Sequence, residues 1–226
     1  MQIREALVRL VVTAVGVSTG LGVIAAAGPA VPTALSILDA GNTATGRLPD
    51  GWRLKVKRGI ADLAVIGEGD NRAIRFRSRG SSFAIERAVD VDINRYPVLA
   101  WNWKVRELPA GGDFRHNSTD DQAAQVLVVF ADHRILSYIW DTSAPKGLFQ
   151  SASSLPLLHI YALVCQSGPE GLNRWSPEAH NLMQDYQRAY DGPAPGVKGI
   201  RLQINTQHTD GSAESYFGNL TFQAAH

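Results

Sequence analysis

Cysteine is almost absent from this sequence: Cys165 is the single cysteine among 226 residues. One thiol cannot form a disulfide bond within the chain, so a small scaffold held together by disulfides is excluded. Cys165 lies in the apolar run 157–165, whose composition favours a buried strand. We therefore interpret Cys165 as a core residue rather than a nucleophile.

An excess of charge of one sign is also absent. The chain has 22 Lys and Arg against 21 Asp and Glu, and residues 1–27 contain two of the arginines and one glutamate, which leaves 20 of each sign in the remainder. Binding to nucleic acid or to an anionic membrane surface depends on an excess of basic side chains. The composition argues against nucleic acid as a partner, and it leaves the membrane as a partner only through the N-terminal segment.

Several motifs of known chemistry are missing. The sequence has no Gly-x-Gly-x-x-Gly or phosphate-loop pattern of nucleotide sites, and no Gly-x-Ser-x-Gly turn of serine hydrolases. Its six histidines include no pair at the spacing of metal ligands on a helix, and no second cysteine accompanies them. We therefore expect no cofactor and no transition-metal site, with a structural calcium ion as the one alternative.

The N-terminus has the pattern of an export signal. Arg4 and Arg9 precede residues 10–27, a run of 18 uncharged residues that ends in three alanines before a Gly-Pro pair. A basic start, an apolar stretch and small residues before the cleavage point are typical of a secretory signal peptide, so we expect residues 1–27 to be removed during export. A retained membrane anchor over residues 10–27 is the alternative, since this length is near the lower limit of a spanning helix.

The remainder is expected to form one domain. Residues 28–46 are rich in small side chains and indicate a lead-in segment with one short strand near Leu35–Leu38. Residues 47–226 show neither a linker nor an internal repeat. About 200 residues suffice for one hydrophobic core but are few for two domains.

Hydrophobic side chains recur with period two through most of this domain. Trp52, Leu54 and Val56 alternate with basic residues, and residues 98–105 place Leu, Trp, Trp and Val on one face. Residues 123–131 are almost wholly apolar, as in a central strand. About ten such strands without alternating helices predict a mainly all-β fold, an antiparallel β-sandwich of jelly-roll type.

One amphipathic helix is expected to pack on the sandwich. Ser176 is a favourable N-cap and Pro177 suits the first helical position. Apolar side chains then recur at helical spacing as far as Tyr190, after which Gly192 and Pro193 end the helix.

The densest polar segment, residues 111–121, connects two apolar strands and contains Asp113, Asp120 and Asp121. Acids at a strand entrance can chelate calcium together with backbone carbonyls, and one of them could act as an acid or base if burial raised its pKa. The structural alternative is that these acids only solubilise the loop and accept hydrogen bonds from its amides.

Tryptophans supply the second candidate feature. Trp101 and Trp103 share a strand face and are expected in the core. Trp140 and Trp175 lie near segment ends, where an exposed indole can stack on a sugar ring, and Asp141 would add a hydrogen-bond acceptor. The candidate ligand-binding residues are therefore Asp113, Asp120, Asp121, Trp140, Asp141 and Trp175.

Several sequence blocks in fixed order resemble the bacterial family called domain of unknown function 3047, from about Leu35 to Phe222. The resemblance implies an exported bacterial β-sandwich without an assigned activity, and it supplies no catalytic residues. Together with the export signal, the single cysteine and the neutral remainder of the chain, it predicts a periplasmic location. One departure is His180-Asn181, where such chains tend to have Arg before Asn. The blocks that carry the resemblance are Pro-Asp-Gly-Trp at 49–52, Leu-Ala-Trp-Asn-Trp-Lys-Val at 99–105, Asp-Asp-Gln-Ala-Ala-Gln-Val at 120–126, Tyr-Ile-Trp at 138–140 and Asp-Tyr at 185–186.

Three functions remain open at this point. The first is a binding module of the bacterial envelope for a glycan or another small polar ligand. The second is a hydrolase that acts on a polysaccharide or an ester with carboxylates of residues 113–121, which needs two carboxyl groups roughly 5–10 Å apart. The third is a structural or assembly protein of the envelope, which predicts a contiguous exposed apolar patch.

Overall fold

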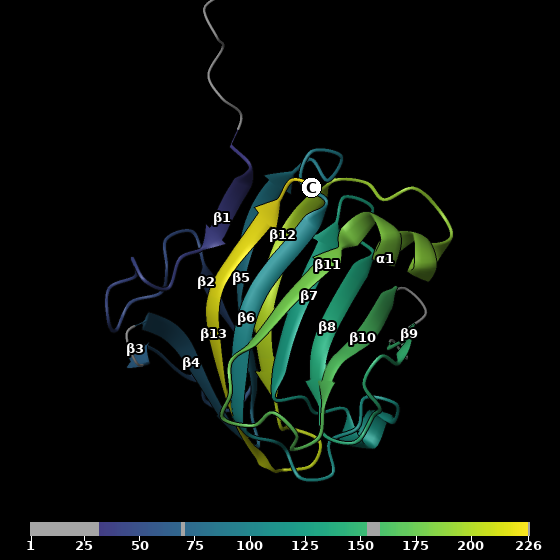
Figure 1. Cartoon of the computed structure of the whole chain (residues 1–226). Helices are drawn as coiled ribbons and strands as arrows, with labels where there is room; N and C mark the ends of the chain where they lie inside the picture. Colours follow the sequence, from purple (N-terminus) through teal and green to yellow (C-terminus); the bar gives the residue numbers. More distant parts are fainter. Residues whose placement is uncertain (1–31, 69–70, 153–158, 226) are drawn as a thin grey trace, which may run out of the picture. The chain divides into compact units, whose positions relative to one another are not determined.

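Two facing β-sheets and one α-helix make up the described part of the chain, which in this computed structural model comprises residues 32–68, 71–152 and 159–225 (Figure 1). The predicted export segment, residues 1–27, lies outside the described residues, which begin at Pro32. The six-stranded sheet has the order β11-β6-β13-β4-β3, with β1 also paired to β13. Its strands are β1 (Ala34–Leu38), β3 (Asp62–Glu68), β4 (Asn71–Arg79), β6 (Val98–Glu107), β11 (Ser176–Asn181) and β13 (Ser212–Gln223).

The seven-stranded sheet has the order β2-β5-β12-β7-β8-β10-β9. All of its neighbouring strands are antiparallel except β8 and β10, which run parallel. The predicted antiparallel β-sandwich with one packed helix is therefore confirmed. The strands are β2 (Arg53–Arg58), β5 (Ser82–Val91), β7 (Ala124–Phe130), β8 (Ile135–Asp141), β9 (Phe149–Ser151), β10 (Ile160–Ser167) and β12 (Val197–Asn205); α1 is Leu182–Tyr190 and a short 3₁₀ turn, η1, is Asn117–Thr119.

The core between the sheets follows from the period-two pattern. Trp101 and Trp103 on β6 are 5% and 0% exposed, with ring centroids 5.4 Å apart in an edge-on arrangement. Phe76 on β4 contacts Phe83 of the opposite sheet at a centroid distance of 5.4 Å. Such offset and edge-on aromatic pairs stabilise a core beyond the apolar area that they bury.

One predicted pair of core residues is exposed instead. Leu54 and Val56 on β2 are 41% and 49% exposed, although their cross-strand partners Ile85 and Phe83 are buried. β2 is an edge strand of the seven-stranded sheet, so it has a neighbouring strand on one side only. The basic residues that alternate along β2 are the kind of charge that discourages edge-to-edge association.

The predicted helix start is wrong. Residues 176–181 form β11, which pairs with β6 as an edge strand of the six-stranded sheet, and Pro177 is tolerated there because an edge strand does not need every N–H. The helix begins only at Leu182, and the side chain of Asn181 accepts hydrogen bonds from the backbone N–H groups of Met183 and Gln184. The predicted end at Tyr190 is confirmed.

This cap yields a first prediction. Asn181→Ala is expected to lower the free energy of unfolding by about 1 kcal/mol, because two N–H groups of the first helical turn lose their acceptor. Ser176→Ala, which removes the cap expected from the sequence alone, should change it by less than about 0.5 kcal/mol. Urea denaturation of both variants measures the difference, and a larger loss for Ser176→Ala would contradict the observed helix start.

Within the described residues, no helix has the length and apolar character needed to cross a membrane.

Candidate functional site

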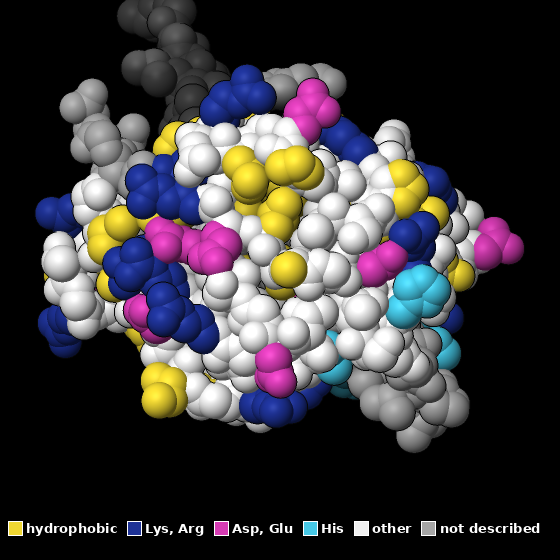
Figure 2. Space-filling model, turned by 90° about the horizontal axis from the view of Figure 1, so that it is seen from below, with side chains coloured by type: hydrophobic (Ala, Val, Ile, Leu, Met, Phe, Trp, Pro, Cys, Tyr) yellow, Lys and Arg dark blue, Asp and Glu magenta, His cyan; other side chains and the backbone are white. Residues whose placement is uncertain are grey.

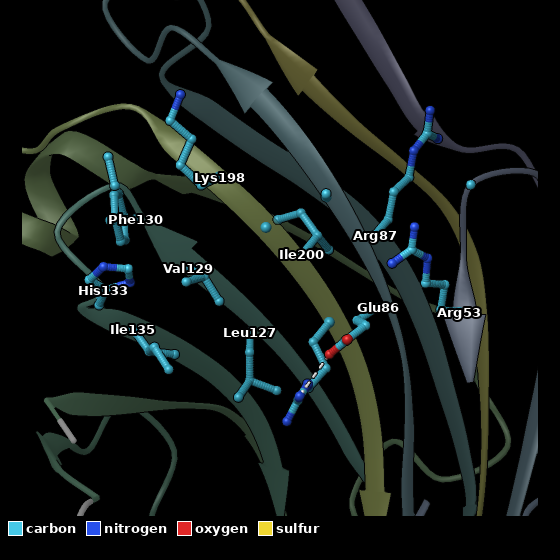
Figure 3. A pocket seen from close by; sticks show the side chains of 15 residues that line it. Arg53, Glu86, Arg87, Leu127, Val129, Phe130, His133, Ile135, Lys198 and Ile200 are labelled. Carbon is cyan, nitrogen blue, oxygen red and sulfur yellow. Dashed lines mark hydrogen bonds and ion pairs between the residues drawn. The ribbon is translucent and has the colours of Figure 1, made fainter. Parts of the chain in front are cut away.

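The outer face of the seven-stranded sheet carries two adjoining hollows, which we call the upper and lower hollows. The upper hollow has a volume of about 800 Å³ and the lower one about 310 Å³. Leu127, Ile135 and Arg201 line both, so the two hollows form one continuous trough across the sheet, termed the outer groove from here on. Figure 3 shows the upper hollow, where side chains from β5, β12, β7 and β8 converge.

Strand register explains how the floor of the groove arises. Val126, Val128 and Phe130 of β7 point into the core and are 0% exposed, so the residues between them point outward. One outward row across β5, β12, β7, β8 and β10 reads Glu86, Arg201, Leu127, Ser137 and Ala162. The neighbouring row reads Ala84, Gln203, Gln125, Ile139 and Val164.

An ion pair marks the junction of the two hollows. Arg201 Nη2 lies 2.8 Å from Glu86 Oε2, and Lys55 Nζ lies 3.4 Å from the other oxygen. Burial raises the pKa of Glu86, but the hydrogen bonds and charges of Arg201 and Lys55 outweigh burial and hold that pKa below its usual value. The Glu86 carboxylate is therefore charged and already engaged by two cations.

The lower hollow combines amide and hydroxyl groups with a small apolar floor. In the part of the chain that the structure describes, the side chains of Gln203, Ser137 and Lys57 line this hollow without a hydrogen-bond partner. Gln125 donates to Asn205 Oδ1 and retains its own carbonyl as an acceptor. Leu127 and Ile139 lie between these polar groups. The hollow therefore offers both donors and acceptors beside an apolar surface.

The 111–121 segment contributes two residues to the walls of the lower hollow. Phe114, from the predicted polar segment, packs with Ile139 and Ala162 over the outer face of β8 and β10. Asp120, from the same segment, lies on the other wall, where it accepts a 2.9 Å hydrogen bond from Gln122 Nε2. Burial raises the pKa of Asp120 above its usual value, and the Gln122 hydrogen bond opposes that rise.

Asp121, a predicted ligand residue, serves the fold instead. Its side chain is 0% exposed, and its Oδ2 accepts hydrogen bonds from the backbone N–H and the hydroxyl of Thr209 at 2.7 and 2.8 Å. His208 N–H and Asn205 Nδ2 also donate to this carboxylate. The oxygens of Asp121 anchor the 205–209 segment and are closed to solvent, so the structure lends no support to the prediction that Asp121 contacts a ligand.

Trp140 and Asp141 are likewise buried, so the prediction that they bind a ligand also finds no support in the structure. The Trp140 indole is 0% exposed, points into the core beside Trp103 and donates to Gly168 O at 3.2 Å. Asp141 is also 0% exposed, and its carboxylate accepts the backbone N–H groups of Phe114, Ser143 and Ala144. Burial raises the pKa of Asp141, and these three hydrogen bonds oppose the rise. An indole at the end of a strand can still point inward, so the position of Trp140 in the sequence did not decide its exposure.

The remaining two predicted residues lie elsewhere. The Asp113 carboxylate is held by the Arg115 side chain, with an Nη2 to Oδ2 distance of 2.6 Å, and this hydrogen bond lowers the pKa of Asp113. Trp175 is partly exposed, but it lines a separate hollow together with Glu170 and Arg174. Of the six predicted ligand residues, only Asp120 lines the outer groove.

The predicted calcium alternative gains no support from the acidic segment. Within this segment, the Asp113 carboxylate is paired with Arg115, and the Asp121 carboxylate accepts hydrogen bonds from the backbone N–H groups of His208 and Thr209. Among the described residues, the three His, Cys or acidic side chains that lie close enough to share an ion are Cys165, Glu178 and His180, which are remote in sequence from residues 111–121.

Sequence reasoning missed the groove residues Gln125, Ser137, Gln203 and Arg201. The signal was nonetheless present. Gln125 and Ser137 are polar positions in largely apolar strands, and Arg201 and Gln203 are the outward positions of an alternating strand. What the sequence could not supply was the strand order, which brings β12, β7 and β8 side by side.

Comparison with known proteins gives one family and a set of distant folds. The sequence model of the family described as "Protein of unknown function (DUF3047)" matches residues 51–221. The search of curated proteins gives no match. Similar solved structures include the family 11 carbohydrate-binding module of cellulase Lic26A-Cel5E of Clostridium thermocellum, at 8% identity and a TM-score of 0.44, covering 83% of this chain and 93% of that one.

Two further solved structures are similar to a comparable degree. The family 30 carbohydrate-binding module of cellulase Cel9D-Cel44B of Clostridium thermocellum has 7% identity and a TM-score of 0.45, covering 84% of this chain and 97% of that one. The K1 cleaved adhesin domain of Lys-gingipain from Porphyromonas gingivalis W83 has 11% identity and a TM-score of 0.43, covering 86% of this chain and all of that one.

Proposed function

We propose that this chain, which belongs to the family of proteins of unknown function DUF3047, is a binding module. Its ligand is a glycan or a similar neutral polar molecule, held in the outer groove. The observation that carries this proposal is the lower hollow. There, Gln203 and Ser137 have no hydrogen-bond partner within the described residues and lie beside the apolar side chains of Leu127 and Ile139.

The chemistry of this hollow suits a sugar. Each sugar hydroxyl both donates and accepts a hydrogen bond, and a carboxamide such as that of Gln203 or Gln125 offers both functions in one plane. The C–H faces of a sugar ring are apolar and need a contact surface, which Leu127 and Ile139 provide. Ligand sites commonly combine an apolar lining with a few such polar groups.

The charge pattern agrees with a neutral ligand. Figure 2 views the molecule from below, where Lys and Arg side chains are interleaved with Asp and Glu rather than gathered in one patch. In the lower hollow, Arg201 is paired with Glu86, and Lys57 and Asp120 are the other Lys, Arg, Asp or Glu residues of the lining, one of each sign. The further basic side chains Arg53, Arg87 and Lys198 line the upper hollow. A strongly anionic ligand would need a surplus of positive charge at the site.

The hydrolase alternative lacks the required pair of carboxylates at this place. Asp120 is the one acid among the residues that line the lower hollow. Glu86, the acid of the upper hollow, is engaged by Arg201 and Lys55. Two carboxyl groups roughly 5–10 Å apart with separate acid and base roles are needed for glycoside hydrolysis. The proposal therefore stays with binding.

Ligand binding is tested by removing one amide. A glycan array first identifies a ligand for the full chain, and isothermal titration calorimetry then measures its Kd. Gln203→Leu keeps the size of the side chain but removes its hydrogen bonds, so we expect roughly a tenfold rise in Kd, equivalent to about 1.4 kcal/mol. Gln184→Leu on the exposed face of α1 is the matched control and should leave Kd unchanged. Absence of any glycan ligand, or equal Kd values for both variants, would contradict the proposal.

We further propose that the protein is exported to a bacterial periplasm after removal of residues 1–27. Residues 10–27 are uncharged; Arg4 and Arg9 precede them and a Gly-Pro pair follows, and this pattern supports the proposal. Mass spectrometry of the protein isolated from the producing cell measures the N-terminus. Gly28 as the first residue is the expected result, whereas an intact Met1 would refute cleavage.

A further inference from the structure

A group of polar side chains lies between the two sheets, apart from the outer groove. It is formed where β10 of the seven-stranded sheet faces β11, the edge strand of the six-stranded sheet, just before α1 begins (Figure 1). A register shift between Val164 and Gln166 makes Cys165 the extra residue of a β-bulge against β8. Bulges redirect side chains and are frequent at functional sites. Here Cys165 and Gln166 both contact β11.

Three of these side chains present donor atoms to a common point. Cys165 Sγ lies 3.5 Å from His180 Nε2, and the same nitrogen lies 3.6 Å from Glu178 Oε2. The three donor atoms all lie within 4.8 Å of one another. Tetrahedral zinc, with a Zn–S bond of about 2.3 Å and Zn–N and Zn–O bonds of about 2.0–2.2 Å, separates sulfur from nitrogen by about 3.6 Å and nitrogen from oxygen by about 3.4 Å. The sulfur–nitrogen and nitrogen–oxygen separations of 3.5 and 3.6 Å therefore match those of ligands on one zinc ion.

The outer atoms of these side chains are also held. Asp185 Oδ2 lies 3.6 Å from His180 Nδ1 and accepts a 2.8 Å hydrogen bond from the Tyr138 hydroxyl. Glu178 Oε1 accepts a 2.7 Å hydrogen bond from Gln166 Nε2, which leaves Oε2 for the common point. A carboxylate on the remote nitrogen of a metal-bound histidine is a recurrent feature of zinc sites, because it fixes the orientation of the ring.

We propose that Cys165, Glu178 and His180 form a binding site for a divalent transition-metal ion of the zinc class, with Asp185 as the residue that positions His180. A thiolate and an imidazole select zinc over the hard ions calcium and magnesium. Three protein donors leave one tetrahedral position for water. The site goes beyond the proposed function, because it involves none of the groove residues. It connects β10 of the seven-stranded sheet with β11, the edge strand of the six-stranded sheet.

The metal-free protein has its own charge balance at this place. Burial lowers the pKa of His180, but the neighbouring Asp185 carboxylate, the Cys165 sulfur and the Glu178 carboxylate outweigh burial and raise that pKa to about 11. Burial raises the pKa of the Cys165 thiol. The imidazolium thus balances the nearby carboxylates until a metal ion displaces its proton and that of the thiol, as coordination does in general.

The experiment uses the full chain, purified without an affinity tag, and Co²⁺ as a spectroscopic substitute for Zn²⁺. We expect one equivalent of Co²⁺ to bind, with the near-ultraviolet absorption of a thiolate–cobalt bond and the strong visible bands of a tetrahedral site, and one equivalent of Zn²⁺ to displace it. Cys165→Ser, which nearly preserves size, should lose the thiolate absorption. Asp185→Asn, which still accepts the Tyr138 hydroxyl, should bind about 10- to 100-fold more weakly.

His116→Gln is the matched control, because His116 is exposed in the 111–121 segment and lies outside the cluster. It should bind Co²⁺ as the unaltered chain does. Near-ultraviolet circular dichroism confirms that each variant is folded. If Cys165→Ser does not fold, Glu178→Gln takes its place, because its side-chain carbonyl still accepts the hydrogen bond from Gln166. No Co²⁺ binding by the unaltered chain, or an unchanged Co²⁺ spectrum in Cys165→Ser, would overturn the proposal. The glycan titration is a separate readout, so the two proposals can fail independently.

Discussion

Asp121→Ala is expected to lower the free energy of unfolding by about 3 kcal/mol or more. The carboxylate is fully buried, and it accepts hydrogen bonds from the backbone N–H groups of His208 and Thr209 and from the Thr209 hydroxyl. Each buried donor left without a partner costs about 1–3 kcal/mol. Several donors lose their acceptor together in this variant, so the loss exceeds that of a typical single substitution.

The measurement is urea denaturation, with Asp120→Asn as the control. Asp120 is the neighbouring acid, but it is only partly buried, and its one side-chain hydrogen bond comes from Gln122. We expect Asp120→Asn to change stability by less than about 1 kcal/mol. Similar stabilities for Asp121→Ala and the unaltered chain would mean that Asp121 is not the anchor described above.

Trp140→Ala is expected to be similarly damaging, with a loss of about 3–5 kcal/mol. The indole is 0% exposed and packs against Trp103, so its removal leaves a large cavity in the core and an unpaired Gly168 carbonyl. Trp140→Phe should cost less, because the ring still fills most of the space.

Trp175→Ala is the matched comparison for this effect. Trp175 is partly exposed and lies under Lys104 Nζ, 5.4 Å from the ring centroid. Its removal should lower the free energy of unfolding by about 1 kcal/mol or less through the lost contact with Lys104, in addition to the contribution of the small apolar area that it covers. Thermal unfolding of both variants measures the contrast. If Trp175→Ala were the more destabilising, the assignment of Trp140 to the core would be refuted.

The sequence predicted the fold well where one physical rule acts alone. Alternation placed Trp101 and Trp103 in the core, and a continuous apolar run made β7 a central strand, as the structure confirms. Alternation misled at Leu54 and Val56, because it shows which face a side chain takes but not whether another sheet covers that face. At residues 176–181, pairing with β6 outweighed the favourable helix start of Ser176 and Pro177.

The candidate site was harder to predict, since the sequence does not show whether an acid faces solvent or backbone amides. Asp120 and Asp121 are adjacent, yet Asp120 lines the lower hollow and Asp121 is enclosed by the 205–209 segment. The pairing of Gln203 with Gln125 depends on strand order within one sheet. The contact of Cys165 with His180 depends on which strands of the two sheets face each other.

The most direct test of the groove is a titration of ¹⁵N-labelled protein with a glycan ligand, followed by the side-chain amide signals of its glutamines. Gln203 and Gln125 lie on the outer face of the seven-stranded sheet, while Gln184 and Gln187 are exposed on α1. The account predicts that the signals of Gln203 and Gln125 shift with saturation at the Kd measured by calorimetry, while those of Gln184 and Gln187 stay in place. Shifts confined to α1, or to the hollow beside Trp175, would contradict it.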